Sequence, residues 1–377
     1  MSIFRGKFEI IFGQNKIEEV SDWLSMRHLT RIGLIVDKNL LNSTGFVKWK
    51  TYFESNHKVI YVKVPDLQSE PSYQDLDREF EAIKLHQIDV MIAFGGGSVL
   101  DIAKGLCIKY TNAGPSVNYR GFDKVDRAGI PLILFPSTAG TGTEMTWTAS
   151  FIDLDSKIKL GINGKNMFPS LSVLDPKLLV NAPFDVICSA ALDVLVHAIE
   201  AVTSKNSSYF AKTLGISATK KILHHLPLLM NSSPDLLDIE TVQIAAAEAG
   251  LAMLNSSGGP ASGISYPMGV HFKVPHGFAG GIVLPLVIKY NIDNAYEGYG
   301  QFFEFPQTSN YKLFEELEQL YSKISVPVNF VRWGFSNLDH VELIYTRTIQ
   351  EKQKNLDLNP IHFSHSSLRN LLETLIL

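Results

Sequence analysis

The sequence predicts two domains: an α/β domain built on a mostly parallel sheet, residues 1–182, and an all-α domain, residues 183–377. Three observations carry this prediction. Apolar strands alternate with amphipathic helices from residue 31 onward, which is the pattern of a parallel sheet covered on both faces. One of these strands opens directly into a run of three glycines. Beyond Pro183 the strand signals fade, and apolar residues recur at helical spacing.

Composition places the chain among ordinary globular proteins. Of its 377 residues, 45% are hydrophobic and 19% are charged, with a formal net charge of −4. The mild acidity, without a long run of Lys and Arg, argues against nucleic acid or an anionic membrane as a partner. The start of the chain lacks the apolar stretch of a signal peptide, and no segment approaches the roughly 18 continuous apolar residues of a membrane span. We therefore expect a cytoplasmic enzyme that acts on a small molecule and forms a homo-oligomer, a dimer.

The elements can be placed from the spacing of apolar residues. Strands appear as short alternating or continuous apolar runs, and helices appear as apolar residues three or four apart. The predicted strands are 7–13, 31–37, 59–64, 90–95, 129–136 and 172–176. The predicted helices are 17–24, 73–86, 184–201, 209–223, 239–254 and 313–324.

An acidic residue, Asp37, ends the strand expected at 31–37. A carboxylate in that place can receive the ribose hydroxyls of NAD, and it would repel the phosphate of NADP. The same residue can cap the helix that follows. The sequence alone leaves both interpretations open.

The strand at 90–95 opens into Gly95, Gly96, Gly97 and Ser98, and then into an amphipathic helix. Glycines let the backbone turn sharply and approach a ligand, while the free amides of a helix N-terminus attract phosphate. We interpret the turn as a pyrophosphate cradle, which its position at the carboxyl end of a parallel strand favours. Neither G-x-G-x-x-G nor the P-loop pattern is present, so a tight strand-to-helix turn is the alternative.

A hydroxyl-rich loop, residues 137–144, follows the strand at 129–136. Thr138 and Thr141 offer donors to phosphate or ribose oxygens without the cost of a buried charge. The alternative is a solvated loop. Further along, Lys157 or Lys159 can neutralise a cofactor phosphate or lie in solvent.

The helix at 184–201 carries Asp193 and His197, four residues apart. At that spacing both side chains project from one face of the helix, one turn apart. A carboxylate oxygen and an imidazole nitrogen so placed form half of a transition-metal site. Taken alone, the pair fits a hydrogen bond inside a core better, because such pairs are common.

Four motifs together favour the metal site over the core hydrogen bond. Their order and approximate spacing resemble those of the iron-containing (group III) alcohol dehydrogenase family along essentially the whole chain. The resemblance implies a dinucleotide-binding α/β domain, a helical domain and a metal ion in the cleft between them, the architecture shared with dehydroquinate synthase. The motifs are Gly95–Ser98 with Asp101 and Lys104, Pro136–Glu144, Asp193–Ala201 and Val274–Gly277.

The same resemblance implies roles for single residues. Asp193, His197 and His276 would be metal ligands, with Fe²⁺ or Zn²⁺ as the ion. The cofactor would be NAD(P), and Asp37 favours NAD. The residues expected to contact the cofactor are Asp37, Gly95, Gly96, Gly97, Ser98, Asp101, Thr138, Thr141 and Lys159.

The chain departs from the family pattern at two positions before His276. Where family members carry a metal-binding His, this chain has Ser262, and where they carry a second His lining the pocket, it has Tyr266. Three interpretations follow: a metal held by three protein ligands plus water or His271, a weak site that substrate completes, or loss of the metal with Tyr266 as the catalytic proton donor.

The resemblance implies an oxidoreductase that moves a hydride between nicotinamide and a small alcohol or aldehyde. The alternatives are a non-redox, NAD-using lyase of the same architecture and a catalytically silent NAD-binding subunit. The lyase's phosphorylated substrate calls for several Lys and Arg, whereas residues 183–280 offer few. The expected catalytic set is Asp193, His197, His276 and Tyr266, and Trp147, Phe151, Tyr266 and Phe272 are candidate pocket walls.

Overall fold

The chain folds into two compact units, which we call the sheet unit and the helical unit. The sheet unit is Gly6–Pro183, and the helical unit is Phe184–Leu377 together with Met1–Arg5. The first residues group with the helical unit because the Asn255 side-chain amide bonds the backbone of Arg5 in both directions. The computed structural model describes residues 3–63, 65, 67, 70–230, 234–303 and 310–376.

Within the described residues, six parallel strands form the main sheet, in the order β1-β11-β6-β4-β2-β3. All six were predicted from their apolar patterns, and the parallel sheet confirms the α/β class. The strands are β1 (Glu9–Phe12), β2 (Arg31–Val36), β3 (Lys58–Lys63), β4 (Val90–Gly95), β6 (Leu132–Pro136) and β11 (Leu171–Leu174).

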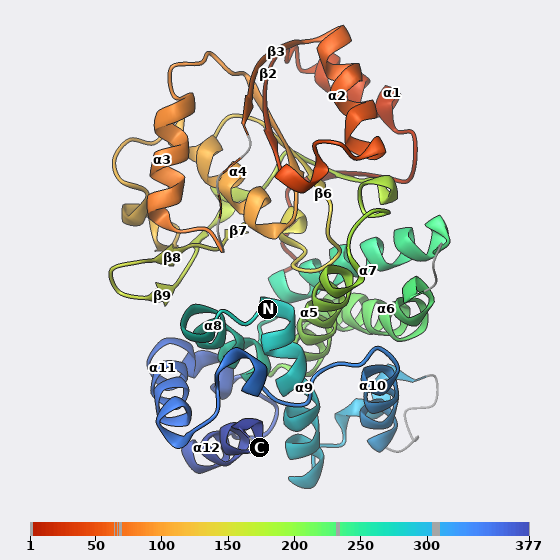
Figure 1. Ribbon diagram of the computed structural model, residues 1–377, viewed down its shortest axis with the longest axis vertical. Helices are drawn as coiled ribbons and strands as arrows, with labels where there is room; N and C mark the ends of the chain where they lie inside the picture. Colours follow the sequence, from red (N-terminus) through yellow and green to blue (C-terminus); the bar gives the residue numbers. More distant parts are fainter. Residues whose placement is uncertain are drawn as a thin grey trace. The chain divides into compact units, whose positions relative to one another are not determined.

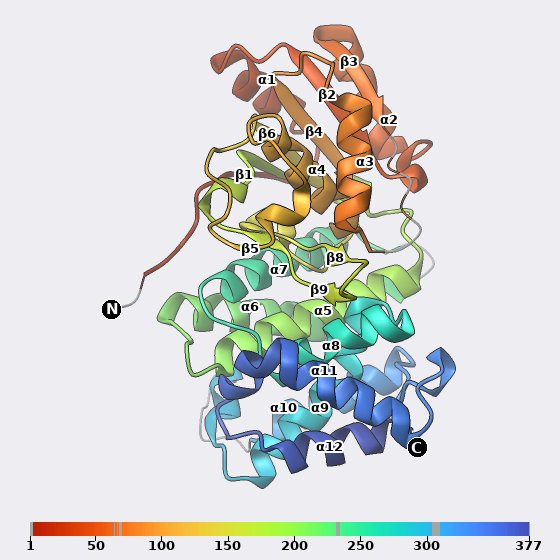
Figure 2. The ribbon, with the colours of Figure 1, turned by 90° about the vertical axis from the view of Figure 1, so that its left-hand side faces the viewer.

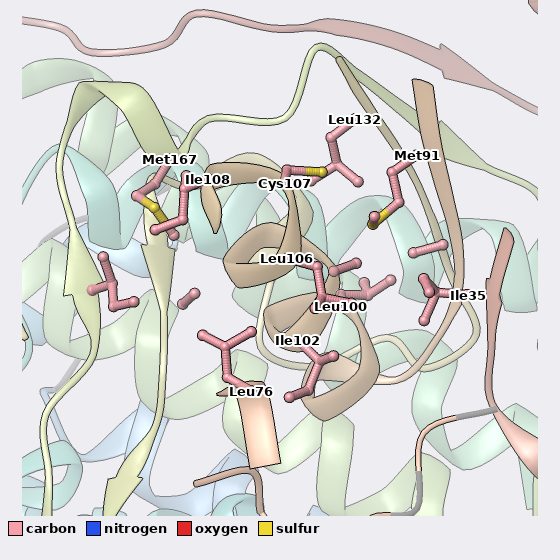
Figure 3. Close-up of a cluster of buried hydrophobic side chains, with 14 of the residues drawn as sticks. Ile35, Leu76, Met91, Leu100, Ile102, Leu106, Cys107, Ile108, Leu132 and Met167 are labelled. Atoms are coloured by element: carbon pink, nitrogen blue, oxygen red, sulfur yellow. The ribbon is translucent and has the colours of Figure 1, made fainter. Parts of the chain in front are cut away.

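Helices cover both faces of this sheet (Figure 1). On one face Ile35 and Met91 pack with Leu76, Leu100 and Leu106 in a buried apolar cluster, which Figure 3 shows around helix α4. Since side chains alternate along a strand, the intervening strand residues face the opposite layer. The covering helices are α1 (Ile17–Met26), α2 (Thr44–Asn56), α3 (Tyr73–Ile83) and α4 (Gly97–Lys109).

Aromatic side chains fill the opposite face. The rings of Phe94 and Phe135 stack with centroids 4.2 Å apart, and Trp49 of α2 lies 4.7 Å from Phe135. Helix α2 was missing from the sequence prediction. Its signals are the apolar residues Phe46, Trp49 and Phe53 at helical spacing, and the preceding Ser43, whose Oγ accepts a hydrogen bond from the Phe46 amide at 3.2 Å.

Short strands flank β6 in the sequence. Phe151 lies between two of them, and its fully buried ring packs against Tyr73 with centroids 5.4 Å apart. Phe151 is therefore part of the core of the sheet unit, and its expected place on a pocket wall is wrong. These strands are β5 (Gly121–Phe122), β7 (Thr148–Ala149), β8 (Ile152–Asp153), β9 (Ile158–Lys159) and β10 (Ile162–Asn163).

The described part of the helical unit contains α-helices and short 3₁₀ turns but no strand, as predicted. Helix α5 packs against α6, α7 and α9, and α8 packs against α9 and α11 (Figure 2). The helices are α5 (Phe184–Thr203), α6 (Tyr209–His225), α7 (Leu236–Leu254), α8 (Pro260–Phe272), α9 (His276–Asp293), α10 (Tyr311–Lys323), α11 (Leu338–Asp357) and α12 (His365–Glu373).

Helix α5 is the one described helix long and apolar enough to cross a membrane. Within the helical unit, however, 72% of its apolar window is buried by neighbouring helices. The helix also carries Asp193, His197 and Glu200 on one stripe. These features indicate the core helix of a folded unit.

Candidate functional site

The parallel register of the sheet unit brings three predicted segments to one edge. The Asp37 amide donates to the Phe94 carbonyl at 2.8 Å, and the Ser137 amide donates to the Gly95 carbonyl at 2.9 Å. The ends of β2, β4 and β6 are thereby adjacent. The chain runs from β2 outward to β3 and then returns to β4 on the other side of β2. Such a reversal of strand order is where open α/β sheets bind ligands.

The glycine turn and the hydroxyl loop are in contact at this edge. A Cβ on Gly96 would lie 3.3 Å from Thr138 Cγ2 and Oγ1, and one on Gly97 would lie 3.0 Å from Thr141 Cγ2 and Oγ1. Within the described residues no side chain caps α4, which begins at this turn. Amides of an uncapped helix N-terminus, beside two hydroxyls and an open backbone, fit a pyrophosphate group.

A buried lysine holds the hydroxyl loop in shape. The Lys104 ammonium donates to the carbonyls of Thr146 and Thr148 at 2.9 and 2.8 Å and to both oxygens of Thr143. Burial lowers the pKa of Lys104 to about 8. The four bonds hold the backbone from Thr143 to Thr148, at the end of the hydroxyl loop.

The charged candidates of the sheet unit have protein partners. Asp101 accepts hydrogen bonds from the Thr143 hydroxyl at 2.7 Å and from the Ser150 amide at 2.8 Å. These bonds position the end of the hydroxyl-rich loop. Lys159 Nζ pairs with Glu70 Oε1 at 2.6 Å. Asp37 Oδ1 accepts from the Asn39 amide at 2.9 Å, which is the capping role. Direct cofactor contacts by these three residues stay predictions.

The helical unit gathers the three predicted metal ligands. Donor atoms of Asp193, His197 and His276 all lie within 4.8 Å of one another. Asp193 Oδ1 is 3.5 Å from His197 Nε2 and 3.8 Å from His276 Nε2. Among the described residues, Asp193 Oδ2 and His197 Nδ1 are buried without a hydrogen-bond partner. A carboxylate and two imidazoles in this arrangement fit a divalent transition metal.

Glycine makes the approach of His276 possible. His276 is the first residue of α9, and a Cβ on the next residue, Gly277, would lie 1.7 Å from the Ser189 carbonyl oxygen of α5. Ser189 lies one helical turn before Asp193. With glycine at 277, the backbones of α5 and α9 touch, and this contact brings the imidazole of His276 beside the Asp193 carboxylate.

Helix α5 also holds the backbone around Ser262, the position where the resemblance predicts a metal-binding histidine. Glu200, one turn beyond His197, accepts hydrogen bonds from the amides of Gly259 and Ala261, both at 2.7 Å, and from the Ser262 amide. Glu200 thus holds the N-terminus of α8, where Ser262 lies. This role of Glu200 was not predicted from the sequence, although its i, i+3 spacing from His197 indicates that both side chains lie on one face of α5. Burial raises the pKa of Glu200, and these amides oppose that rise.

Two further candidates lie on α8. The ring of Tyr266 meets the His276 ring edge to face, with centroids 5.3 Å apart, so it lies beside the Asp193–His197–His276 cluster, and its role as a pocket or catalytic residue stays a prediction. His271 lies near the end of α8 and is not among the residues whose donor atoms cluster with Asp193. A swing of His271 into the vacant ligand place therefore has no support in this arrangement.

A nucleotide-type turn at a sheet switch point and a carboxylate–imidazole cluster on helices are the parts of a metal-dependent, nicotinamide-linked oxidoreductase. Residues 8–176 match the profile of iron-containing alcohol dehydrogenase, and residues 187–376 match the C-terminal part of the Fe-containing alcohol dehydrogenase family. The chain belongs to the iron-containing alcohol dehydrogenase family. This membership confirms the family, fold class and enzyme class predicted from the sequence.

Individual relatives agree with the family assignment. The chain is 26% identical to alcohol dehydrogenase 4 of Schizosaccharomyces pombe over 74% of this chain and 66% of that protein. It is 28% identical to the NAD-dependent methanol dehydrogenase of Bacillus methanolicus over 75% of this chain and 74% of that one. The crystal structure of a 1,3-propanediol oxidoreductase has the same fold, with a TM-score of 0.91, 22% identity and 99% of both chains covered.

We predict that Gly96→Ala weakens cofactor binding about tenfold, because the added methyl group would displace Thr138 and hold a pyrophosphate away from the amides of α4. Titration of NADH fluorescence measures the affinity, and a thermal unfolding midpoint close to wild type shows that the fold is retained. Unaltered NADH affinity in a folded variant would place the phosphates elsewhere.

We predict that Gly277→Ala lowers the free energy of unfolding by about 2–4 kcal/mol and the metal affinity with it, since α9 must move off α5. Chemical denaturation and elemental analysis report the two effects. Gly280→Ala is the matched control, because the atoms nearest to its Cβ would belong to side chains and not to the backbone: two Val196 methyl groups at 3.1 and 3.4 Å and Ser265 Cβ at 3.7 Å. Equal effects of both substitutions would contradict the special role of position 277.

Proposed function

We propose that this protein is an NAD-linked alcohol dehydrogenase that interconverts a small primary alcohol and its aldehyde. The observation that carries the proposal is the Asp193–His197–His276 cluster in a chain of the iron-containing alcohol dehydrogenase family. The sheet unit would bind the dinucleotide and the helical unit the metal and substrate. In the reducing direction the aldehyde carbon gains a hydride and its oxygen gains a proton, so that C=O becomes CH–OH.

When bound, reduced nicotinamide supplies the hydride and a divalent cation, Fe²⁺ or Zn²⁺, supplies Lewis acidity toward the substrate oxygen. Asp193, His197 and His276 would hold that cation, and three protein ligands leave an open position. Gly96, with the amides of α4, would orient the dinucleotide through its phosphates. Dinucleotide binding would thus belong to the sheet unit and cation binding to the helical unit.

Ser262 weakens the expected metal site without removing it. A serine hydroxyl is a poor ligand compared with an imidazole, so the affinity should be lower than in relatives with four ligands. The second candidate function is metal-free reduction with the Tyr266 phenol as proton donor, which the contact between Tyr266 and His276 favours. Removing the cation discriminates between the two.

We expect His197→Ala to abolish both metal binding and turnover, whereas His271→Ala should retain both because His271 stands outside the ligand cluster. Elemental analysis and the loss of NADH absorbance with a panel of aldehydes measure the two properties. Full turnover after exhaustive chelation, with no metal detected, would overturn the metal-dependent mechanism and make Tyr266 the catalytic acid.

We expect a preference for NAD over NADP that depends on the charge of Asp37. One carboxylate oxygen caps the turn that follows β2, and the other would face the ribose. Asp37→Asn keeps an oxygen for the cap and removes the charge, so the preference should shrink about tenfold while stability changes little. Kinetics with both cofactors test this, and an unchanged preference would leave Asp37 with the capping role alone.

We also infer a cytoplasmic homodimer. Both cysteines, Cys107 and Cys188, are buried and free, which fits a reducing compartment. Strand β1 lies at the edge of the sheet and exposes Ile10 and Phe12, which suits pairing with a second copy.

A further inference from the structure

The sheet unit contains a pocket at the amino ends of its strands. The pocket has a volume of about 390 Å³, within the roughly 300–1,000 Å³ range of small-molecule sites. It is lined by the segments that lead into three adjacent strands, β1, β11 and β6, and by one side of α4. The glycine turn lies at the carboxyl end of β4, which is the opposite end of the parallel strands. None of the residues expected to bind the cofactor or the metal lines this pocket.

Apolar side chains make up much of the lining. The rings of Phe8 and Phe168 are half-buried and contact each other, with centroids 5.9 Å apart. Part of each ring therefore remains accessible to the apolar portion of a ligand. Deeper lining residues belong to the buried cluster around α4, and Figure 3 labels four of them: Cys107, Ile108, Leu132 and Met167.

The unpaired charge at this pocket is positive. Lys7 precedes β1, Lys165 lies in the turn that precedes β11, and both line the pocket with exposed side chains. Neither forms an ion pair or a side-chain hydrogen bond within the part of the chain that the structure describes. The one carboxylate in the lining, Glu9, is already bound by Arg27 Nη2 at 2.6 Å and by Trp23 Nε1 at 3.0 Å.

The polar backbone and hydroxyl groups of the lining also suit an anion. Ser170 Oγ accepts a hydrogen bond from the Leu132 amide at 3.4 Å, so the hydroxyl proton is left to donate. Carbonyl groups near the end of α4 would repel an anion, but amide donors already occupy them. The Ile130 amide bonds the Cys107 carbonyl at 3.3 Å, and the Asn112 side chain bonds the Ile108 carbonyl at 2.9 Å.

We propose that this pocket binds a small organic anion with an apolar body, such as an aromatic carboxylate or sulfonate. The apolar body would pack on Phe8 and Phe168, where it leaves water. The anionic group would accept hydrogen bonds from the ammonium groups of Lys7 and Lys165 and from the Ser170 hydroxyl. Such a ligand would contact α4, the helix that begins at the glycine turn. The proposal is independent of the dehydrogenase chemistry, because the two sites share no predicted ligand-binding residue.

Calorimetric titration with 2-naphthalenesulfonate tests the site, and 2-naphthol is the neutral probe with the same ring system. Lys7→Met and Lys165→Met should each weaken sulfonate binding about threefold to fivefold, and the double variant about tenfold or more, because solvent partly screens exposed charges. The affinity for 2-naphthol should stay within about twofold in all of these variants. Lys58→Met is the matched control, because Lys58 is an exposed lysine at the start of β3, the other edge strand of the sheet, and this variant should bind as wild type.

Titration with NAD⁺ present distinguishes this pocket from the dinucleotide site, and sulfonate binding should persist. Loss of sulfonate binding on addition of NAD⁺ would place the anion at the glycine turn and overturn the proposal. Equal sulfonate affinity in wild type and the double variant would also overturn it, as would a wild-type protein that does not bind the sulfonate. Sedimentation velocity adds a further check: lysine variants that change the oligomeric state, in a protein that does not bind the sulfonate, would assign the pocket to contact with a second copy.

Discussion

The ligand cluster depends on the direct contact between the backbones of α5 and α9. An ordinary pair of helices keeps its axes 8–10 Å apart because side chains lie between them. Here Gly277 removes the side chain where α9 crosses Ser189, so the first residue of α9 reaches the carboxylate one turn further along α5. Any larger residue at 277 would separate His276 from Asp193. The three donors therefore converge because of the packing of α9 on α5.

The stripe of α5 that begins at Asp193 organises more than the ligand cluster. Asp193 and His197 present donors, and Glu200, on the same stripe, accepts amide hydrogen bonds from the N-terminus of α8. A buried carboxylate is costly unless it is hydrogen-bonded, and the helix N-terminus supplies both donors and a favourable dipole. The backbone at Ser262 is thus held in place by Glu200 although the serine side chain is a poor metal ligand.

Much of the fold could be predicted because strands such as β2 and β4 are unbroken apolar runs and α5 has a strong periodic pattern. The register of parallel strands then brings the end of β2 to the glycine turn without further information. Helices α8 and α9 were not predicted, because Gly263, Pro267 and Gly277 have low intrinsic helix propensity. In the folded chain, packing against neighbouring helices overrides this low propensity. The approach of His276 to Asp193 could not be predicted either, because it depends on the contact between Gly277 and the Ser189 carbonyl about 90 residues earlier in the sequence.

The tyrosine at position 266 suits the neighbouring Lys352 of α11 better than a histidine would. An imidazole at position 266 would become a cation when protonated and would repel an ammonium 3.5 Å from the ring centre. A phenol instead presents a negative ring face that attracts the ammonium. Tyr266 is therefore compatible with a neighbouring positive charge in a place where a protonated histidine would not be.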